Sequence, residues 1–300
     1  MSIIVSNISK LYGEQKALNN VSFEIGKNEI VGFLGPNGAG KSTMMKILTC
    51  YLPATEGSAT VCGFNVNEQS IDVRKQIGYL PEHNPLYLDM YVKEFLEFIG
   101  NLYAIKHIKN RVKEMIEMTG LQIEQNKKIG ALSKGYRQRV GLAQAIIHDP
   151  KVLIMDEPTT GLDPNQLEEI RELIKKLGKE KTVMLSTHIM QEVEAVCNRV
   201  IIINKGEIVA NEQTLSLQKN TAKQIITVEF DREVSFDHLK NIDGVLEVIL
   251  FENNIWKITS NLDTDVRKAI FDYAVTHSIS ILTINKEEQK LEEVFKKLTK

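Results

Sequence analysis

The sequence lacks several features that would place it in a broad class of proteins. It has only three cysteines, Cys50, Cys62 and Cys197, without a C-x-x-C spacing, so we expect free structural thiols rather than a disulfide framework. No run approaches the roughly 18 apolar residues that a membrane span requires. The first residues also lack the basic and apolar regions of a signal peptide. Any association with a membrane is therefore expected to come through a partner or a surface.

A strong excess of charge is also missing. Lys and Arg number 37 and Asp and Glu number 39, which gives a formal net charge of -2. Because nucleic acid and anionic lipid are recruited by strongly basic surfaces, we expect no nucleic-acid partner. The composition, 43% hydrophobic and 25% charged, is ordinary for a globular protein, and 300 residues suffice for one large domain with a smaller one or for two medium domains.

A glycine-rich loop is the most informative stretch of the chain. It follows a compact apolar run, 29–34, and precedes a helical run without breakers, 42–49. The loop fits the pattern G-x-x-x-x-G-K-[ST] with Gly35, Pro36, Asn37, Gly38, Ala39, Gly40, Lys41 and Ser42. A plain glycine turn is the simpler interpretation, but the order of strand, loop and helix favours a phosphate site.

The chemistry of such a loop follows from its residue types. Its backbone N–H groups and the positive end of the next helix cradle phosphate oxygens. Lys41 would reach the β- and γ-phosphates, the Ser42 hydroxyl would hold Mg²⁺, and Thr43 would assist at the α-phosphate.

Two acids follow an apolar run further along the chain. The run is Val152–Met155, and Asp156 and Glu157 come directly after it. A carboxylate at the end of such a strand lies beside the phosphate loop in open α/β sheets. Asp156 would bind Mg²⁺ through water, and Glu157 would point at the attacking water. Taken alone, the pattern fits the capped start of a helix equally well.

Two further segments have residues that alone do not decide between a structural and a functional role. His188 ends the strand after the acidic one, so it can reach the γ-phosphate, although a lone histidine is more often structural. In Leu132–Arg139, Ser133 is a good helix N-cap and Gly135 keeps the backbone open. For that segment a cap is a better interpretation than a ligand.

The order of elements predicts an α/β fold followed by a smaller α+β domain. Apolar runs between helices predict parallel strands that are covered on both faces. A polar stretch around 213–223 marks a boundary, so we expect a first domain at 1–215 with a helical part at about 82–145, a linker at 216–223 and a second domain at 224–300. The second domain reads β-α-β-β-α-β, which suggests a ferredoxin-like sandwich. A last helix would have one apolar face: Leu291, Val294, Phe295 and Leu298.

These motifs, in this order, resemble the ATPases of the ABC transporter family over about residues 2–215. The resemblance implies a P-loop NTPase fold with a RecA-like core, an antiparallel β subdomain and a helical subdomain. It assigns five named motifs: Walker A to Gly35–Ser42, Walker B to Val152–Glu157, the signature loop to Leu132–Gln138, the D-loop to Thr160–Asp163 and the switch histidine to His188. It also matches Tyr12 to the aromatic that stacks on adenine.

The resemblance implies partners and cofactors as well. In the family, ATP with Mg²⁺ lies between the Walker A loop of one ATPase and the Ser133 and Gly135 positions of a second one. We therefore expect a dimer, with two copies of this chain as the simplest form. A separate transmembrane permease would place the dimer at the cytoplasmic face of the inner membrane.

Two positions depart from the family pattern. The signature is usually Leu-Ser-Gly-Gly-Gln, whereas this chain has Lys134 and Tyr136 at the third and fifth positions. The Q-loop usually offers glutamine, but here Glu82 follows Ile77–Pro81. A glutamate keeps an oxygen ligand for Mg²⁺ or water and adds a charge.

Within the family, the chain is most similar to exporter-type ATPases with a C-terminal extension that ends like Leu291–Phe295. The run Gly135–Ala145 is most like the gliding-motility-associated ATP-binding subunits of Bacteroidetes. A soluble ABC ATPase that acts on ribosomes, DNA or another non-transport complex is the alternative, and a non-catalytic regulator is a third. The single motif set argues against the soluble ATPase, and the intact Lys41, Asp156, Glu157 and His188 argue against the regulator. The transported substrate and the role of the C-terminal domain stay open.

Overall fold

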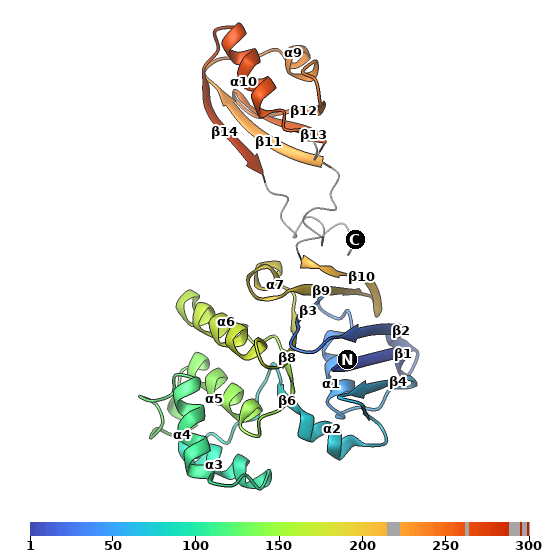
Figure 1. Cartoon of the computed structure of the whole chain (residues 1–300), viewed down its shortest axis with the longest axis vertical. Coiled ribbons are helices and arrows are strands. Elements are labelled where there is room, and N and C mark those ends of the chain that lie inside the picture. The colour runs from blue at the N-terminus through green and yellow to red at the C-terminus, as the bar shows by residue number, and fades with distance from the viewer. Residues whose placement is uncertain (215–222, 262–263, 288–294, 296–298, 300) are drawn as a thin grey trace. The chain divides into compact units, whose positions relative to one another are not determined.

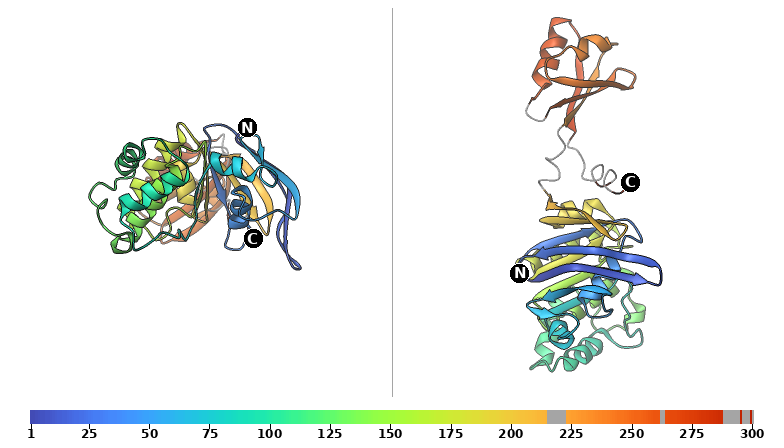
Figure 2. Two further views of the ribbon diagram at one scale, coloured as in Figure 1. Left: turned by 90° about the horizontal axis from the view of Figure 1, so that it is seen from below. Right: turned by 90° about the vertical axis from the view of Figure 1, so that its right-hand side faces the viewer.

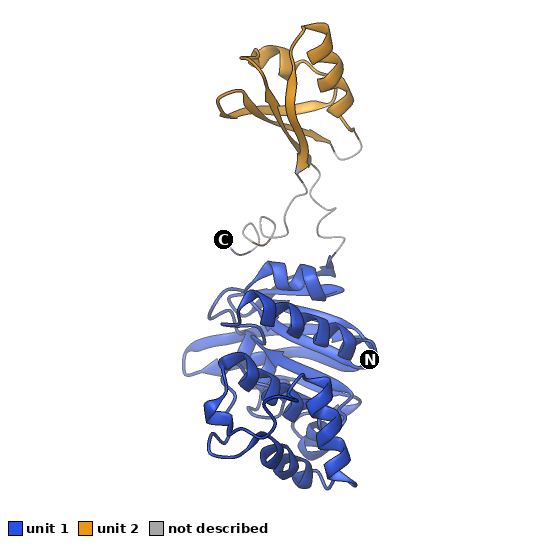
Figure 3. Cartoon of the chain, turned by 90° about the vertical axis from the view of Figure 1, so that its left-hand side faces the viewer, with its two compact units in different colours: residues 1–214, 298–300 blue, residues 215–297 orange. Residues whose placement is uncertain are grey.

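The computed structural model describes residues 1–214, 223–261 and 264–287, together with Phe295 and Thr299. The described residues fall into two compact units, the larger with residues 1–214 and Thr299 and the smaller within 215–297 (Figure 3). Each unit has a hydrophobic core of its own. Most of the expected linker at 216–223 and most of the expected last helix, with Leu291, Val294 and Leu298, lie outside the described residues.

An antiparallel sheet of four strands begins the larger unit. Its order is β2-β1-β4-β5, and Figure 2 shows its long strands side by side. The strands are β1 (Ile3–Tyr12), β2 (Gln15–Ile25), β4 (Glu56–Val61) and β5 (Phe64–Asn65). Apolar residues at 3–5 and the apolar/polar alternation at 21–25 indicate only short strands here. The observed strands are longer because β1 and β2 pair across a hairpin as far as Tyr12 and Gln15.

A second sheet, of six strands, forms the centre of the larger unit. Its order is β10-β9-β3-β8-β7-β6, parallel except for the edge strand β10. The strands are β3 (Ile30–Leu34), β6 (Ile77–Leu80), β7 (Val152–Asp156), β8 (Thr182–Thr187), β9 (Arg199–Asn204) and β10 (Glu207–Gln213). Every residue of β3, β7 and β8 is buried, as expected for parallel strands covered on both faces.

Helices cover this sheet and add a separate helical part. The apolar side chains of α1 (Lys41–Leu48) belong to the core that both sheets share. The helices α2 (Ser70–Gln76), α6 (Pro164–Gly178) and α7 (Met190–Val196) also belong to this unit. Figure 1 shows three helices grouped away from the antiparallel sheet: α3 (Val92–Leu102), α4 (Ile108–Met118) and α5 (Lys134–Ile146). The expected α/β fold with antiparallel and helical parts is confirmed.

The smaller unit has the element order β-α-β-β-α-β that the sequence pattern predicted. Its antiparallel sheet has the order β12-β13-β11-β14, the topology of a ferredoxin-like sandwich. Its elements are β11 (Lys223–Phe230), α9 (Phe236–Lys240), β12 (Val245–Glu252), β13 (Ile255–Asn261), α10 (Arg267–Thr276) and β14 (Ile281–Glu287). Just before α10, the Asp265 carboxylate accepts the N–H of Arg267 and shapes a turn at the start of the helix.

No helix among the described residues has both the length and the apolar character to cross a bilayer.

Candidate functional site

The candidate site lies where three neighbouring strands of the six-stranded sheet end. Strands β3, β8 and β7 are adjacent, and their last residues are Leu34, Thr187 and Asp156. Leu34 pairs with Thr187 and Asp156 with Ser186, so the carboxyl ends of the strands lie level. The glycine loop, Glu157 and His188 follow these ends directly. Segments more than a hundred residues apart therefore meet at one edge, where open α/β sheets bind ligands.

A cavity of about 510 Å³ opens at this edge. Its lining includes most of the site residues that the sequence predicted: Tyr12, Asn37, Gly38, Gly40, Lys41, Ser42, Thr43, Glu82, Glu157 and His188. Gln15, Ala17 and Thr160 also line it. Gln15 and Ala17 reach the cavity because β2 runs past the loop, and no local pattern in the sequence indicates this.

The glycine loop needs its glycines for conformation and for space. Gly40 has φ +107°, in the left-handed region that L side chains rarely adopt, and a Cβ there would lie 2.6 Å from the Ala17 carbonyl oxygen. A Cβ on Gly35 would overlap the Ile203 carbonyl oxygen. Three predicted residues of the loop, Gly35, Pro36 and Ala39, do not line the cavity formed by the described residues: the carbonyl oxygens of Gly35 and Pro36 accept hydrogen bonds from Lys41 Nζ, and Ala39 is buried. The backbone thus bends sharply and leads into α1.

Lys41 is buried among polar groups at the start of α1. Its Nζ donates to the carbonyl oxygens of Gly35, at 2.7 Å, and Pro36, at 3.2 Å, and lies 3.8 Å from Glu157 Oε1. Burial lowers the pKa of Lys41 below the ordinary lysine value, and the nearby carboxylates of Glu157, Asp156 and Glu82 oppose this shift. An ammonium so placed is available to an anion that enters the cavity.

Asp156 is the last residue of β7, and Glu157 follows it directly. Asp156 accepts a hydrogen bond from the Ser186 hydroxyl. Glu157 is 8% exposed and has φ +49°, an uncommon conformation for a residue with a side chain. Its N–H donates to the carbonyl oxygen of Ser186, at 3.2 Å, and to Ser186 Oγ, at 3.1 Å. The neighbouring strand therefore holds the strained backbone that turns the Glu157 carboxylate toward the cavity.

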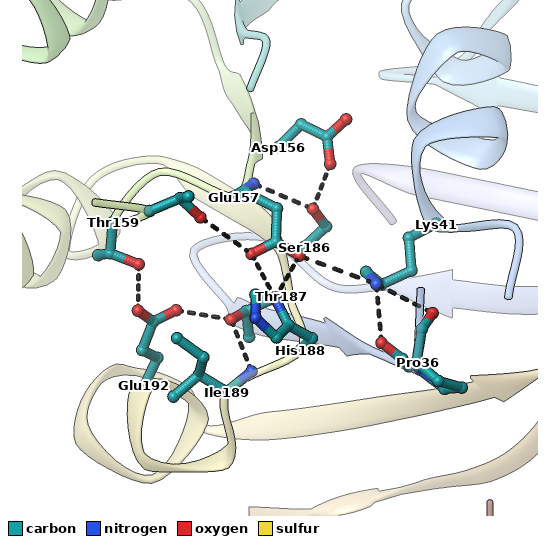
Figure 4. A network of polar contacts seen from close by, with 12 residues as sticks. Pro36, Lys41, Asp156, Glu157, Thr159, Ser186, Thr187, His188, Ile189 and Glu192 are labelled. Carbon is teal, nitrogen blue, oxygen red and sulfur yellow. Dashed lines mark hydrogen bonds and ion pairs between the residues drawn. The ribbon is translucent and has the colours of Figure 1, made fainter. Parts of the chain in front are cut away.

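His188 and Glu157 form a close pair. The Nδ1 of His188 lies 3.0 Å from both carboxylate oxygens of Glu157, while the histidine side chain stays half-exposed in the cavity. Figure 4 shows Lys41 and His188 both in contact with the Glu157 carboxylate. A carboxylate held between an ammonium and an imidazole is well placed to orient and polarise a water molecule.

The expected metal ligands lie between this cavity and a larger one. Ser42 and Glu82 line both, and Asp156 lines the larger cavity, whose volume is about 650 Å³. A hydroxyl and two carboxylates are hard oxygen donors, the type that Mg²⁺ prefers, so the residues fit this ion. The larger cavity runs on toward α2, α3 and α5 and is lined there by Arg74, Leu102, Tyr103, Gln144 and His148.

Ser133 and Gly135 do not line the phosphate-site cavity formed by the described residues. Ser133 caps α5, because its Oγ accepts the Tyr136 N–H at 3.4 Å. Gly135 packs against Gln166, and a Cβ at Gly135 would overlap the Gln166 side chain. The Nζ of Lys134 lies against Gly161. The cap that the residues alone suggested is thus present.

Tyr12 lies at the open edge of the cavity, half-exposed at the end of β1. We expect Tyr12→Ala to weaken ATP and ADP binding by about tenfold, because base stacking on an aromatic ring contributes roughly 1–3 kcal/mol. Tyr12→Phe keeps the ring and should bind normally. Titration with a fluorescent nucleotide measures both affinities, and equal affinities for Tyr12→Ala and the original chain would exclude stacking.

Comparisons with known proteins agree with this geometry. The family model for ABC transporters matches residues 18–160. The ABC transporter ATP-binding protein NatA of Bacillus subtilis is 40% identical over 72% of this chain and 89% of its own length. The bacitracin transport ATP-binding protein BcrA of Bacillus licheniformis is 32% identical over 99% of this chain and 98% of its own. The linearmycin resistance ATP-binding protein LnrL of Bacillus subtilis is 33% identical over 98% and 96%, respectively.

Solved structures give the same result. The dimeric ABC transporter cassette MJ0796 is 30% identical, with a TM-score of 0.65 over 70% of this chain and 98% of that one. A second structure of MJ0796, bound to ADP and phosphate after hydrolysis, has a TM-score of 0.66. This chain belongs to the ABC transporter family, as an ATP-binding subunit that hydrolyses ATP.

Proposed function

We propose that this chain drives an exporter in the membrane as a dimer of two copies, which bind two ATP molecules between them. One observation carries the proposal: Lys41, Glu157 and His188 meet in one cavity, while Ser133 and Gly135 lie outside it. The hydrolytic half of a site is thus present in each chain, and the signature loop is left to complete the site of a second chain.

The residues of the cavity account for hydrolysis as follows. The N–H groups of the glycine loop and the Nζ of Lys41 bind the phosphate oxygens and stabilise charge that develops on them. The Glu157 carboxylate orients the attacking water in line with the terminal phosphate and accepts its proton. His188 holds that carboxylate through Nδ1 and is close enough to the cavity to contact the γ-phosphate.

Mg²⁺ fits the oxygen donors at the junction of the two cavities. Ser42 and Asp156 would hold it, with Glu82 at the position where the family usually has glutamine. When bound, the ion supplies positive charge to the phosphate oxygens. Glu82 also lines the larger cavity, so a movement of Glu82 at the nucleotide would change the shape of that cavity.

The larger cavity is the best candidate for contact with a permease. It lies beside the nucleotide site and combines exposed apolar and aromatic side chains, such as Leu102 and Tyr103, with the charged Arg74. A helical segment of a membrane subunit could dock there and follow the closing and opening of the dimer. This arrangement would place the chain at the cytoplasmic face of the inner membrane.

Export is the direction of transport that the relatives favour. Relatives that match nearly the whole chain are described as bacitracin transport and linearmycin resistance proteins. We therefore propose an antibiotic-like substrate class for the permease. The link to gliding motility stays a prediction that rests on the run Gly135–Ala145 alone.

Purification of the tagged chain from detergent-solubilised membranes tests this proposal. We expect one integral membrane protein to co-purify in a stable ratio. Leu102→Glu, in the larger cavity and 68% exposed, should reduce its recovery by about tenfold, because a charge opposes docking of an apolar segment. Ile123→Glu, at an 82% exposed apolar residue that does not line the cavity, is the matched control. Recovery of ribosomes or DNA in place of a membrane protein would overturn the proposal.

A further inference from the structure

Glu192 is a buried acid that the family motifs leave without a function. It lies in the first turn of α7 and is only 3% exposed. Its Oε1 accepts a hydrogen bond from the Thr159 hydroxyl, and its Oε2 accepts one from the Thr187 hydroxyl at 2.6 Å. Figure 4 shows the carboxylate between these two threonines. Both threonines are themselves buried.

The two threonines flank the reactive pair in the sequence. Thr159 comes two residues after Glu157, and Thr187 comes directly before His188. Thr187 Oγ1 also accepts the Ile189 N–H at 3.0 Å, which fixes the backbone on the other side of His188. Glu192 therefore joins the loop that carries Glu157 to the loop that carries His188, through atoms that belong to neither of those two residues.

A buried carboxylate is a poor choice for stability alone. Removing it from water costs free energy that two hydroxyl donors offset only in part, and an apolar side chain of similar size would fill the same volume without that cost. The carboxylate does fix the positions of the two threonines, because it accepts a hydrogen bond from each of them at the same time. The two loops are held at one separation as a result.

We propose that Glu192 is a positioning residue, which sets the distance between Glu157 and His188 during ATP hydrolysis. The proposal rests on the roles given to these two residues above. The Glu157 backbone is left-handed, so its carboxylate stays in place only while the surrounding structure holds the loop. Ser186 holds the loop before Glu157, and the bridge from Thr159 to Glu192 holds it after. A displacement of about 1 Å at a reacting group can cost about a hundredfold in rate.

The first test is the kinetics of Glu192→Ala and Glu192→Gln in the full chain. We expect Glu192→Ala to lower kcat by about tenfold to a hundredfold, while the affinity for a fluorescent ADP analogue changes by less than about threefold. Glu192→Gln keeps the length of the side chain. Its amide oxygen accepts from one threonine and its NH₂ donates to the other hydroxyl, which can rotate, so most of kcat should return. Glu194→Ala, an exposed acid on the same helix, is the control.

A double-mutant cycle with Thr159 separates positioning from simple stability. Thr159→Val keeps the volume and removes the hydroxyl, whereas Thr159→Ser keeps the hydroxyl. Thr159→Val should lower kcat in the original chain and have almost no further effect in Glu192→Ala, and Thr159→Ser should behave like threonine. Additive effects of the two substitutions on kcat would overturn the bridge.

Two other outcomes are decisive. If Glu192→Ala lowered the melting temperature but left turnover per folded molecule unchanged, Glu192 would be structural only and the inference would be wrong. Normal turnover by Glu157→Gln would instead refute the proposed hydrolytic roles, whatever the Glu192 variants did, so the two failures are distinguishable.

Discussion

Glu157→Gln is expected to lower ATP turnover by roughly 10²–10⁴-fold while nucleotide binding remains. The amide has the same shape as the carboxylate, so the left-handed backbone and the packing around it should persist. It cannot accept a proton from water, which removes the proposed general base. Hydrolysis is the step that would let the two chains separate, so ATP-bound dimers should accumulate. Phosphate release measures turnover, and light scattering in the presence of ATP measures the dimer.

A buried acid away from the cavity provides the control for this experiment. Glu124 is 8% exposed, as Glu157 is, and pairs with Lys127 at 3.0 Å. Glu124→Gln therefore reproduces the loss of one buried carboxylate and should retain full turnover. If Glu157→Gln hydrolysed ATP at the original rate, Glu157 would have no catalytic role.

The second large effect is expected for Lys41→Ala, which should weaken both ATP binding and the chemical step. The substitution removes an ammonium that lies within 3.8 Å of Glu157 and opens onto the cavity. Glu157 and Asp156 then remain without that positive charge and repel the phosphates. We expect the affinity for ATP to fall by about a hundredfold, which corresponds to about 2.7 kcal/mol, and turnover to become undetectable.

Calorimetric titration with ATP measures this loss directly. Lys75→Ala is the matched control, because Lys75 is an exposed lysine in α2 that pairs with Asp72 and does not line either cavity. An ATP affinity of Lys41→Ala close to that of the control would show that Lys41 does not bind phosphate.

The glycine loop and the strand that precedes it could be predicted from the sequence, because both depend on local chemistry. Only glycine adopts the backbone of Gly40 without strain, and an apolar run without polar residues can be satisfied only by burial, as in β3. The β-α-β-β-α-β order of the smaller unit could be predicted for the same reason, since periodicity and turn residues mark each element. The strand order β12-β13-β11-β14 is the one that this element order suggested.

The tertiary structure decided the contacts between residues that lie far apart in the sequence. Sequence motifs named Glu157 and His188 one at a time, but their 3.0 Å contact exists only because β7 and β8 are adjacent and end level. Glu192 carries no motif at all, and its hydrogen bonds to Thr159 and Thr187 exist only because α7 packs against the two loops. The sequence by itself thus determined the groups that we propose bind phosphate. Only the fold decided which acid faces which base, because hydrogen-bond distances are set by the packing of strands and helices that are remote along the chain.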